Sequence, residues 1–387
     1  MTDLRVLHVS SGNLFGGVEA MLLALAQCPG GRLAMDTRIA LCHEGRLSQA
    51  LRNGGSSVLV LPSPRASRPV TVLRARAALA ETLARESFDC VVCHAPWVHA
   101  IFGPTVRDAD IPLALWLHGP VSGRHWSERW AGWTLPALVI CASRFIARTV
   151  PKLYPGIPTV IVHPPVDVSP RLVPVGERRR IREELNTPEA AVAIIQASRT
   201  EAWKGHEMLL DALAQLRDVP RWVWWQVGGP QRAFEIAYLQ SLRERADQLG
   251  IIDRVRFVGE RTDVPRLLAA ADIHCQANLR PEPFGIVFVE ALAAGLPVVS
   301  MAMGGATEIV DETCGLLVPP GDTATLAGAL RLLIDDPSLR ARLAAGASAR
   351  ARQISGSVRQ ADLLREALSL LGSDPVPTGA VAAMSTC

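Results

Sequence analysis

The segment from Glu282 to Glu290, Glu-Pro-Phe-Gly-Ile-Val-Phe-Val-Glu, places two carboxylates around the predicted start of a helix. Pro283 is typical of a loop, and the apolar residues after it predict a helix that begins at about Phe284 or Gly285. The first amides of a helix have no partner inside it, and the helix dipole adds positive charge there. The amides concerned are those of Phe284, Gly285, Ile286 and Val287. The segment therefore predicts a diphosphate site.

The two carboxylates of this segment have different predicted partners. Glu290 stands nearly two turns into the helix, where a carboxylate on one face can accept hydrogen bonds from a ribose diol. Glu282 stands just before the helix and would meet a sugar. The alternative for Glu290 is an exposed helix carboxylate with no ligand.

Arg199 and Lys204 lie in the loop after a predicted strand at 191–198, and Gly205 opens the next helix. Two cations at the carboxyl end of a strand suit a charged leaving group, whose charge grows in the transition state. A surface loop with two basic residues is common. However, Lys204 is one of only two lysines, with Lys152, among the 40 Lys and Arg of the chain. A lysine retained in so arginine-rich a chain suggests a point contact with one phosphate oxygen.

The first half of the chain offers two weaker candidates. A glycine-rich turn that includes Gly16 and Gly17 follows the first predicted strand, but it lacks the spacing of a dinucleotide-binding loop. Its simplest use is to let the backbone approach a phosphate or sugar. His118 ends the predicted strand 113–119, where it is either a functional side chain or a structural one.

Trp126, Trp130 and Trp133 recur at helical spacing, between and beside Arg124 and Arg129. Such a stripe either touches the inner membrane surface, where a lipid-linked acceptor would lie, or packs into the core. The sequence leaves both interpretations open.

Short apolar strands that alternate with helices predict an α/β fold of parallel sheets with covered faces. The alternation is interrupted by a Pro- and charge-rich stretch at 164–180 and then restarts, which indicates two doubly wound, Rossmann-like domains facing across a cleft. The predicted parts are an N-terminal domain at 1–168, a C-terminal domain at 169–357, a helix at 358–372 that crosses back, and a disordered tail at 373–387.

Composition excludes several classes of protein. The net charge of +3 argues against a nucleic-acid partner, and no apolar run approaches the roughly 18 residues of a spanning helix. The N-terminus enters a strand directly and does not resemble a signal peptide, so we expect a cytoplasmic protein. Cys90 and Cys93 form a C-x-x-C pair without a second pair, which favours buried thiols over a zinc site.

Several of these motifs occur together and in order, and the chain resembles glycosyltransferase family 4, which has the two-domain GT-B fold. The matching segments are Gly-Gly-Val-Glu at 16–19, Arg199-x4-Lys204-Gly205, Phe-Val-Gly at 257–259, Glu-Pro-Phe-Gly-x4-Glu at 282–290, Gly-Gly-x-x-Glu at 304–308 and 315–322. The resemblance implies that the C-terminal domain binds a nucleotide-diphosphate sugar and the N-terminal domain binds a saccharide or lipid-linked acceptor. It also implies a role in cell-envelope or exopolysaccharide synthesis.

The resemblance assigns roles to individual residues. Arg199 and Lys204 would bind the diphosphate, Glu290 the ribose, and Glu282 the hydroxyls of the donor sugar. His118 would lie near the sugar and support catalysis. The remaining positions are Gly17, whose amide would face the phosphate, and Gly259, Glu260 and Arg261, which would lie beside the base.

The chain departs from the family pattern at two places. It has His163-Pro-Pro-Val-Asp167 where many members have Asn-Gly before an acidic residue, and Gln276-Ala277-Asn278 where Pro-Ser often precedes the Glu-Pro-Phe-Gly segment. These departures leave the hinge and the preferred donor sugar open.

The mechanism expected from the family is a retaining hexosyl transfer by front-face displacement, without a metal or cofactor. The expectation of no metal rests on the premise that the chain has no Asp-x-Asp motif. The alternatives are a nucleotide-sugar epimerase or a phosphorylase of the same fold, or a non-catalytic nucleotide-sugar-binding protein. A phosphorylase usually needs a pyridoxal-lysine, for which only Lys152 and Lys204 are available.

Overall fold

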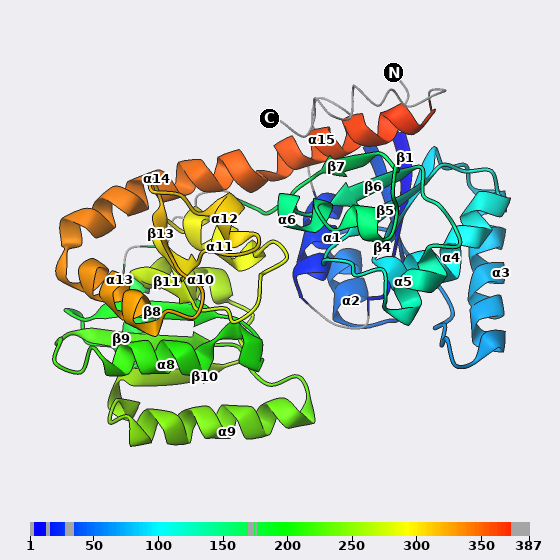
Figure 1. Ribbon diagram of the computed structural model, residues 1–387. Coiled ribbons are helices and arrows are strands. Elements are labelled where there is room, and N and C mark those ends of the chain that lie inside the picture. Colours follow the sequence, from blue (N-terminus) through cyan, green and yellow to red (C-terminus); the bar gives the residue numbers. More distant parts are fainter. Residues whose placement is uncertain (1–3, 13–15, 28–34, 169–173, 175, 373–387) are drawn as a thin grey trace. The chain divides into compact units, whose positions relative to one another are not determined.

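The computed structural model describes residues 4–12, 16–27, 35–168, 174 and 176–372. The chain divides into two compact units (Figure 1). Unit 1 comprises Met1–Asp167 and Ser355–Cys387, and unit 2 comprises Val168–Ile354. Each is a parallel sheet covered by helices, which confirms the α/β class.

Unit 1 contains a seven-stranded parallel sheet in the order β3-β2-β1-β4-β5-β6-β7. Its strands are β1 (Leu4–Ser10), β2 (Met35–Leu41), β3 (Val58–Val60), β4 (Cys90–His94), β5 (Leu113–Leu117), β6 (Leu138–Cys141) and β7 (Thr159–Ile161). The strand order reverses direction between β1 and β4. In such sheets, ligands bind at the carboxyl ends of the strands on either side of that reversal.

The helices of unit 1 are α1 (Gly17–Gln27), α2 (Arg46–Asn53), α3 (Pro69–Arg85), α4 (Pro96–Asp108), α5 (Trp126–Ala131), α6 (Arg144–Ala147) and α15 (Ser357–Ser369). Apolar side chains of α3 and α4 pack with those of the central strands into one core, which includes Leu79, Ile101 and Phe102. Helix α15 contacts α1, and the amide of Val166 donates to the carbonyl of Ser355 at 3.0 Å. The C-terminal helix therefore belongs to unit 1.

Unit 2 contains a six-stranded parallel sheet in the order β10-β9-β8-β11-β12-β13. Its strands are β8 (Val192–Ala197), β9 (Trp222–Val227), β10 (Val255–Gly259), β11 (Ile273–Gln276), β12 (Val298–Met301) and β13 (Gly315–Val318). Here the order reverses between β8 and β11, so the loops after these two strands meet at the carboxyl edge.

The helices of unit 2 are α7 (Glu177–Glu184), α8 (His206–Ala214), α9 (Ala233–Gln248), α10 (Val264–Ala270), α11 (Ile286–Ala293), α12 (Ala306–Ile309), α13 (Thr323–Asp335) and α14 (Pro337–Ser355). Helices α8, α9 and α13 pack on one face of the sheet, around Trp222 and Trp224. Among the described residues, no helix is long and apolar enough to cross a bilayer.

The main differences from the sequence-based elements lie near the end of unit 2. Strand β13 and helices α13 and α14 were not among the predicted elements, although the Gly-Leu-Leu-Val run at 315–318 forms the strand. The thiols of Cys90 and Cys93 are fully buried in the sheet of unit 1, as expected. Burial raises the pKa of both thiols above its ordinary value.

Candidate functional site

The loops after β8 and β11 bring Lys204 and Glu282 together in unit 2. The ammonium of Lys204 donates to Oε2 of Glu282 at 2.7 Å, and the side chains are only 13% and 12% exposed. The two residues are 78 positions apart in sequence, so the sheet topology creates the pair. A nearly buried ion pair at a strand reversal is a strongly polar feature at the edge of the sheet where ligands bind.

Two amide side chains complete the surroundings of Glu282. Asn278 donates from Nδ2 to Oε2 at 2.8 Å, and Gln276 donates from Nε2 to the same oxygen at 3.3 Å. The amide of Gln276 also donates to Oδ1 of Asn278 at 2.9 Å. One oxygen of Glu282 thus accepts from three donors, which fixes the direction of the carboxylate.

Close backbone contact between the two loops makes this arrangement possible. Gly205 has φ 74°, and a Cβ at this position would lie 1.6 Å from the carbonyl oxygen of Ala277. Only glycine fits there. Next to it, the Lys204 ammonium lies 3.9 Å from the ring centroid of Trp203, which is a cation–π distance. The aromatic face therefore helps to hold the lysine.

Arg199, the other predicted cation, begins the same loop. Its guanidinium contacts Glu201 at 2.6 Å, and the arginine side chain is 32% exposed. The chain brings Lys204 directly to Glu282, whereas Arg199 is held beside a different carboxylate. A guanidinium has five donors, so this contact leaves others to engage a ligand.

Helix α11 begins one residue later than the predicted range, at Ile286, with Gly285 as its N-cap at φ 104°. Phe284 and Phe288 are buried and anchor the start of the helix. The predicted contact residues Ile286 and Val287 are partly exposed in the first turn, and Glu290 is partly exposed in the second. The carboxylates at 282 and 290 therefore stand before and within one short helix.

The glycine pair after β12 supports the Glu282 loop. The amide of Gly305 donates to the backbone carbonyl of Glu282 at 2.8 Å, and Gly304 forms a parallel bridge with Glu282. These contacts give the Gly-Gly-x-x-Glu segment a structural role, because they tie the loop after β12 to the loop after β11.

The segment from Gly259 to Arg261 begins at the last residue of β10, at the same edge of the sheet. The carbonyl of Gly259 accepts from the amide of Gly228 at 2.8 Å, and the side chain of Glu260 is exposed. Arg261 makes a two-point contact with Asp263, at 2.7 and 2.8 Å, and a third with Glu184 at 2.5 Å. These carboxylates raise the pKa of Arg261 and occupy its guanidinium.

In unit 1, Gly16 and Gly17 are exposed where α1 begins after the first strand. The amide of Gly16 donates to Oε2 of Glu19 at 2.9 Å, and Glu19 is buried. The glutamate of the Gly-Gly-Val-Glu segment thus holds the turn that presents the two glycines.

His118 follows β5 and is the last of three hydrogen-bonded histidines. Nδ1 of His8 lies 3.0 Å from Nε2 of His94, and Nδ1 of His94 lies 2.8 Å from Nε2 of His118. Burial lowers the pKa of His8 to about 4 and that of His118 to about 3. Burial and the two neighbouring imidazoles hold the pKa of His94 well below 6.5. The group is therefore uncharged at neutral pH.

The premise behind the expectation of no metal was wrong, because Asp108-Ala109-Asp110 is an Asp-x-Asp sequence. Its position separates it from the candidate site. Asp108 ends α4, just before β5, so the motif lies at the amino edge of the sheet and His118 at the carboxyl edge. Among the described residues, no group of three or more His, Cys, Asp or Glu is arranged to hold a metal ion.

Comparison with protein families accounts for both units. Residues 15–170 match the model described as Glycosyltransferase Family 4, and residues 177–350 match the model described as Glycosyl transferases group 1. The chain belongs to glycosyltransferase family 4. The strand orders of its two sheets agree with the GT-B fold that this family has.

Individual relatives give the same assignment. The chain is 35% identical over 214 residues to the D-inositol 3-phosphate glycosyltransferase of Jonesia denitrificans, with 53% of this chain and 50% of the relative covered. It is 36% identical over 168 residues to the lipopolysaccharide core biosynthesis glycosyltransferase LpsD of Rhizobium meliloti, with 43% and 46% covered. The chain spans about half the length of the curated relatives it matches.

A solved structure covers nearly the whole family 4 chain. HepE of Anabaena, crystallised with UDP, superposes with a TM-score of 0.83 at 26% identity, over 95% of this chain and 100% of HepE. HepE has also been solved with UDP and glucose and with UDP-glucose.

The tryptophan stripe of this family 4 chain is split between surface and core. Helix α5 ends at Ala131, so Trp133 lies beyond it, and the stripe is not one helical face. Trp126 and Trp133 are 52% and 80% exposed, whereas Trp130 is partly buried and packs against the core of unit 1. The core interpretation therefore holds for Trp130, whereas Trp126 and Trp133 lie at the surface.

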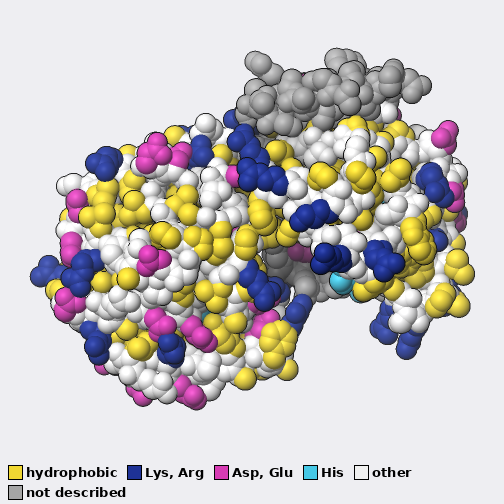
Figure 2. Space-filling model, viewed as in Figure 1, with side chains coloured by type: hydrophobic (Ala, Val, Ile, Leu, Met, Phe, Trp, Pro, Cys, Tyr) yellow, Lys and Arg dark blue, Asp and Glu magenta, His cyan; other side chains and the backbone are white. Residues whose placement is uncertain are grey.

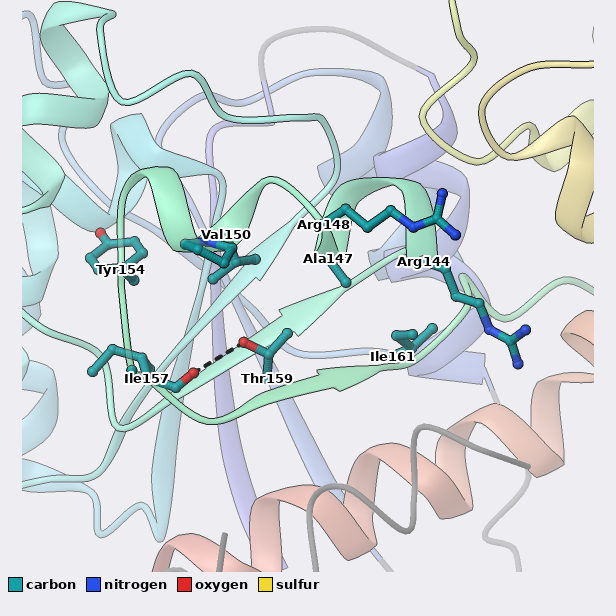
Figure 3. A pocket seen from close by; sticks show the side chains of 10 residues that line it. Arg144, Ala147, Arg148, Val150, Tyr154, Ile157, Thr159 and Ile161 are labelled. Atoms are coloured by element: carbon teal, nitrogen blue, oxygen red, sulfur yellow. Dashed lines mark hydrogen bonds between the residues drawn. The ribbon is translucent and has the colours of Figure 1, made fainter. Parts of the chain in front are cut away.

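A pocket in unit 1 lies apart from every predicted site residue. Its volume is about 470 Å³, and it is lined by α6, the segment after it and β7. Figure 3 shows its apolar floor, with the heads of Arg144 and Arg148 directed away from Tyr154. None of the candidate residues lines this pocket, so the candidate site consists of the residues at the strand ends described above.

Sequence reasoning missed the side chains that support the predicted ones. Gln276 and Asn278 were noted only as departures from the family pattern, yet both contact Glu282. His8 and His94 were not singled out. A signal existed, because each of these residues ends or nearly ends a strand whose carboxyl end borders a candidate loop.

Proposed function

We propose that this chain is a retaining, metal-independent glycosyltransferase that moves a hexose from a nucleotide-diphosphate sugar to a saccharide or lipid-linked acceptor, in cell-envelope or exopolysaccharide synthesis. The observation that carries the proposal is the Lys204–Glu282 contact at the strand reversal of unit 2, directly before the first turn of α11. One cluster thus holds donors for a diphosphate and a carboxylate for sugar hydroxyls.

The relatives support the donor and acceptor classes. HepE is crystallised with UDP and with UDP-glucose, which is a nucleotide-diphosphate sugar. LpsD is named for lipopolysaccharide core biosynthesis, and the relative from Jonesia acts on an inositol phosphate. We place the reaction of this chain in the cytoplasm, where nucleotide sugars are made.

The ion pair is compatible with diphosphate binding. A lysine ammonium has three N–H donors, and the contact with Glu282 uses one of them. The others can reach a phosphate oxygen, together with Arg199 and the amides of Ile286 and Val287 at the start of α11. Lys204 then connects the phosphate with the carboxylate that contacts the sugar.

In the proposed reaction, the acceptor hydroxyl attacks the anomeric carbon on the face from which the diphosphate departs. The bond from that carbon to the phosphate oxygen breaks, and the bond to the acceptor oxygen forms. The acceptor proton passes to the departing phosphate oxygen, so no protein nucleophile is required. Arg199, Lys204 and the helix amides stabilise the growing negative charge.

The reaction as proposed uses neither a metal nor a cofactor, since the two cations and the helix terminus supply positive charge. The test is turnover by purified protein after dialysis against EDTA. Unchanged turnover supports this part of the proposal. Loss of turnover that Mg²⁺ or Mn²⁺ restores would contradict it.

The first test of the donor is thermal stability in the presence of UDP, GDP, ADP and their common sugar conjugates. A ligand at 100 times its dissociation constant adds about 2.7 kcal/mol of stability. We expect one nucleotide to stabilise the wild type and to stabilise Glu290→Gln much less. If no nucleotide stabilises folded protein, the chain is not a nucleotide-sugar enzyme.

Product analysis separates transfer from its alternatives. With the identified donor and an acceptor, NMR of the product should show the anomeric configuration of the donor retained. A changed sugar nucleotide formed without acceptor would indicate an epimerase, and dependence on free phosphate would indicate a phosphorylase. Donor binding without any turnover would indicate a non-catalytic binding protein.

We also propose that unit 1 contacts the inner membrane surface through Trp126, Trp133 and Leu135. These side chains are 52%, 80% and 64% exposed, and Arg124 and Arg129 are exposed beside them. On the face shown in Figure 2, basic side chains over unit 1 have few acidic neighbours, whereas over unit 2 the two charges are mixed. Tryptophan with arginine suits the interface of an anionic bilayer.

A further inference from the structure

Three neighbouring strands of unit 1 each contribute one histidine to a continuous hydrogen-bonded chain. His8 lies in β1, His94 is the last residue of β4, and His118 follows β5. The two links measure 3.0 and 2.8 Å. The rings of His94 and His118 are nearly parallel, at 7° with centroids 5.1 Å apart, and both stack on Trp116. The strand reversal between β1 and β4 therefore holds an ordered imidazole group.

The direction of hydrogen-bond donation along the three histidines follows from the buried end of the series, at His8. A neutral imidazole has one N–H donor and one acceptor nitrogen, so all donors must point the same way along the chain. Among the described residues, Nε2 of His8 has no hydrogen-bond partner. If the chain ran from His118 to His8, that nitrogen would be a buried N–H without an acceptor, which proteins avoid more strictly than an unpaired acceptor.

The opposite direction leaves only an unpaired acceptor. His8 then donates from Nδ1 to Nε2 of His94, and His94 donates from Nδ1 to Nε2 of His118. His118 accepts at Nε2, so its single proton is on Nδ1. His8 and His94 are 0% and 2% exposed, whereas His118 is partly exposed. The N–H that ends this series of hydrogen bonds thus belongs to the most exposed of the three histidines.

We infer that His8 and His94 are positioning residues that fix His118 as the Nδ1–H tautomer, so that it offers an uncharged, directed donor to a sugar hydroxyl oxygen. The partner oxygen rests on the proposed function, but the tautomer does not. A charged imidazolium would attract phosphate or any other anion, without selecting a hydroxyl. A neutral N–H favours a hydroxyl at one position and angle, which suits recognition of a sugar.

The tautomer can be measured directly on the full chain. Long-range ¹H–¹⁵N correlation spectra of protein labelled at histidine distinguish the protonated ring nitrogen from the unprotonated one. His118→Gln identifies the His118 signals. We expect the proton of His118 on Nδ1 in the wild type without any ligand. A proton on Nε2, or a mixture of tautomers, would overturn the inference.

Two substitutions of His94 test its positioning role. His94→Leu removes the donor to His118 with little change in volume, and His94→Asn keeps an N–H donor near the Nδ1 position. We expect mixed tautomers of His118 in the leucine variant and the Nδ1–H form in the asparagine variant. The matched control is His99→Leu, which removes another buried histidine of unit 1 whose bond goes to the carbonyl of Thr134. An unchanged tautomer in folded His94→Leu would also overturn the inference.

Kinetics with the identified donor connect the tautomer to turnover. Loss of one oriented neutral hydrogen bond should lower kcat/KM of His94→Leu about 5- to 10-fold, without changing the dissociation constant of the nucleoside diphosphate alone. His94→Asn should recover most of that loss. Equal losses in His94→Leu and His99→Leu would show a merely structural role. If the wild type has the expected tautomer but transfers no sugar, the proposed function fails and the tautomer assignment stands.

Discussion

The two units have the same kind of sheet, yet the side chains at their strand reversals differ in charge. In unit 2, Lys204 and Glu282 form an ion pair, and Arg199 and Glu201 form a second one in the loop after β8. In unit 1, the corresponding position holds the uncharged group His8, His94 and His118. The same topology therefore positions formal charge in one unit and neutral donors in the other.

This difference shows how two sheets of the same topology can be suited to different chemical groups of a ligand. A diphosphate carries localised negative charge, which cations and a helix terminus stabilise strongly. A sugar hydroxyl carries none and is recognised by the direction of a hydrogen bond. The charged unit is thus suited to the leaving group and, through Glu282, to sugar hydroxyls, whereas the neutral unit is suited to a directed hydrogen bond with the sugar. The predictions below test this contrast.

The largest effect is expected from Lys204→Ala, which removes the cation of the charged unit. Loss of one donor to a departing charged group lowers the rate about 100- to 1,000-fold. We expect that loss in kcat/KM, together with loss of thermal stabilisation by the nucleotide. The matched control is Lys152→Ala, because Lys152 is exposed and is the only other lysine. Near-normal turnover of Lys204→Ala would show that the charge of unit 2 is not needed for the leaving group, which contradicts the contrast between the units.

Asn278→Asp should act through the sugar end of the same cluster. It replaces a donor to Glu282 with a second carboxylate, so it removes a charge-assisted hydrogen bond and adds repulsion. We expect kcat/KM to fall roughly 10- to 100-fold, with affinity for the nucleoside diphosphate much less affected. Asn186→Asp, an exposed position in the same unit, controls for the added charge. Equal weakening of sugar nucleotide and nucleotide would place Asn278 at the phosphate instead.

The sequence was sufficient for most of the architecture and for the position of one helix start in unit 2. Alternation of strands and helices predicted both sheets, and one segment predicted a helix start that lies within two residues of its position in α11. Supporting contacts were not predictable, because they depend on register. His94 reaches His118 only because β4 and β5 pair so that His94 lies opposite Trp116. The contact of Asn278 with Glu282 likewise depends on how the loop after β11 folds back.

Acid should destabilise unit 1 more than unit 2. Burial lowers the pKa of four histidines in unit 1 and two in unit 2; in unit 1 these are His8, His94, His99 and His118, and in unit 2 they are His206 and His274. Each binds a proton near pH 6.5 when unfolded but only well below that pH when folded. Below pH 6.5 the unfolded chain therefore binds more protons, and the free energy of unfolding falls as pH falls.

The size of this effect follows from the two additional histidines. From pH 6.5 to 5.5 each contributes a loss of about 1 kcal/mol, so local opening of unit 1 should increase about 30-fold more than that of unit 2. Hydrogen exchange measured by mass spectrometry, with peptides assigned to each unit, gives both values. The interval from pH 7.5 to 8.5 is the control, because these histidines are neutral there in both states. Equal acid sensitivity of the two units would show that the imidazoles of unit 1 are not buried in neutral form.

The smallest effect concerns the surface, where the contrast between the units predicts membrane contact by unit 1 only. Trp133 and Phe234 are exposed aromatic residues, at 80% in unit 1 and 64% in unit 2. Trp133→Ser should weaken binding to vesicles that contain anionic lipid about fivefold, since burying about 40 Å² of the ring contributes ~1 kcal/mol. Phe234→Ser should leave binding unchanged, and added salt should weaken binding of the wild type because arginines contribute. Equal weakening by both substitutions would mean that contact with the bilayer is not specific to unit 1. The two units would then differ in function only at their strand ends.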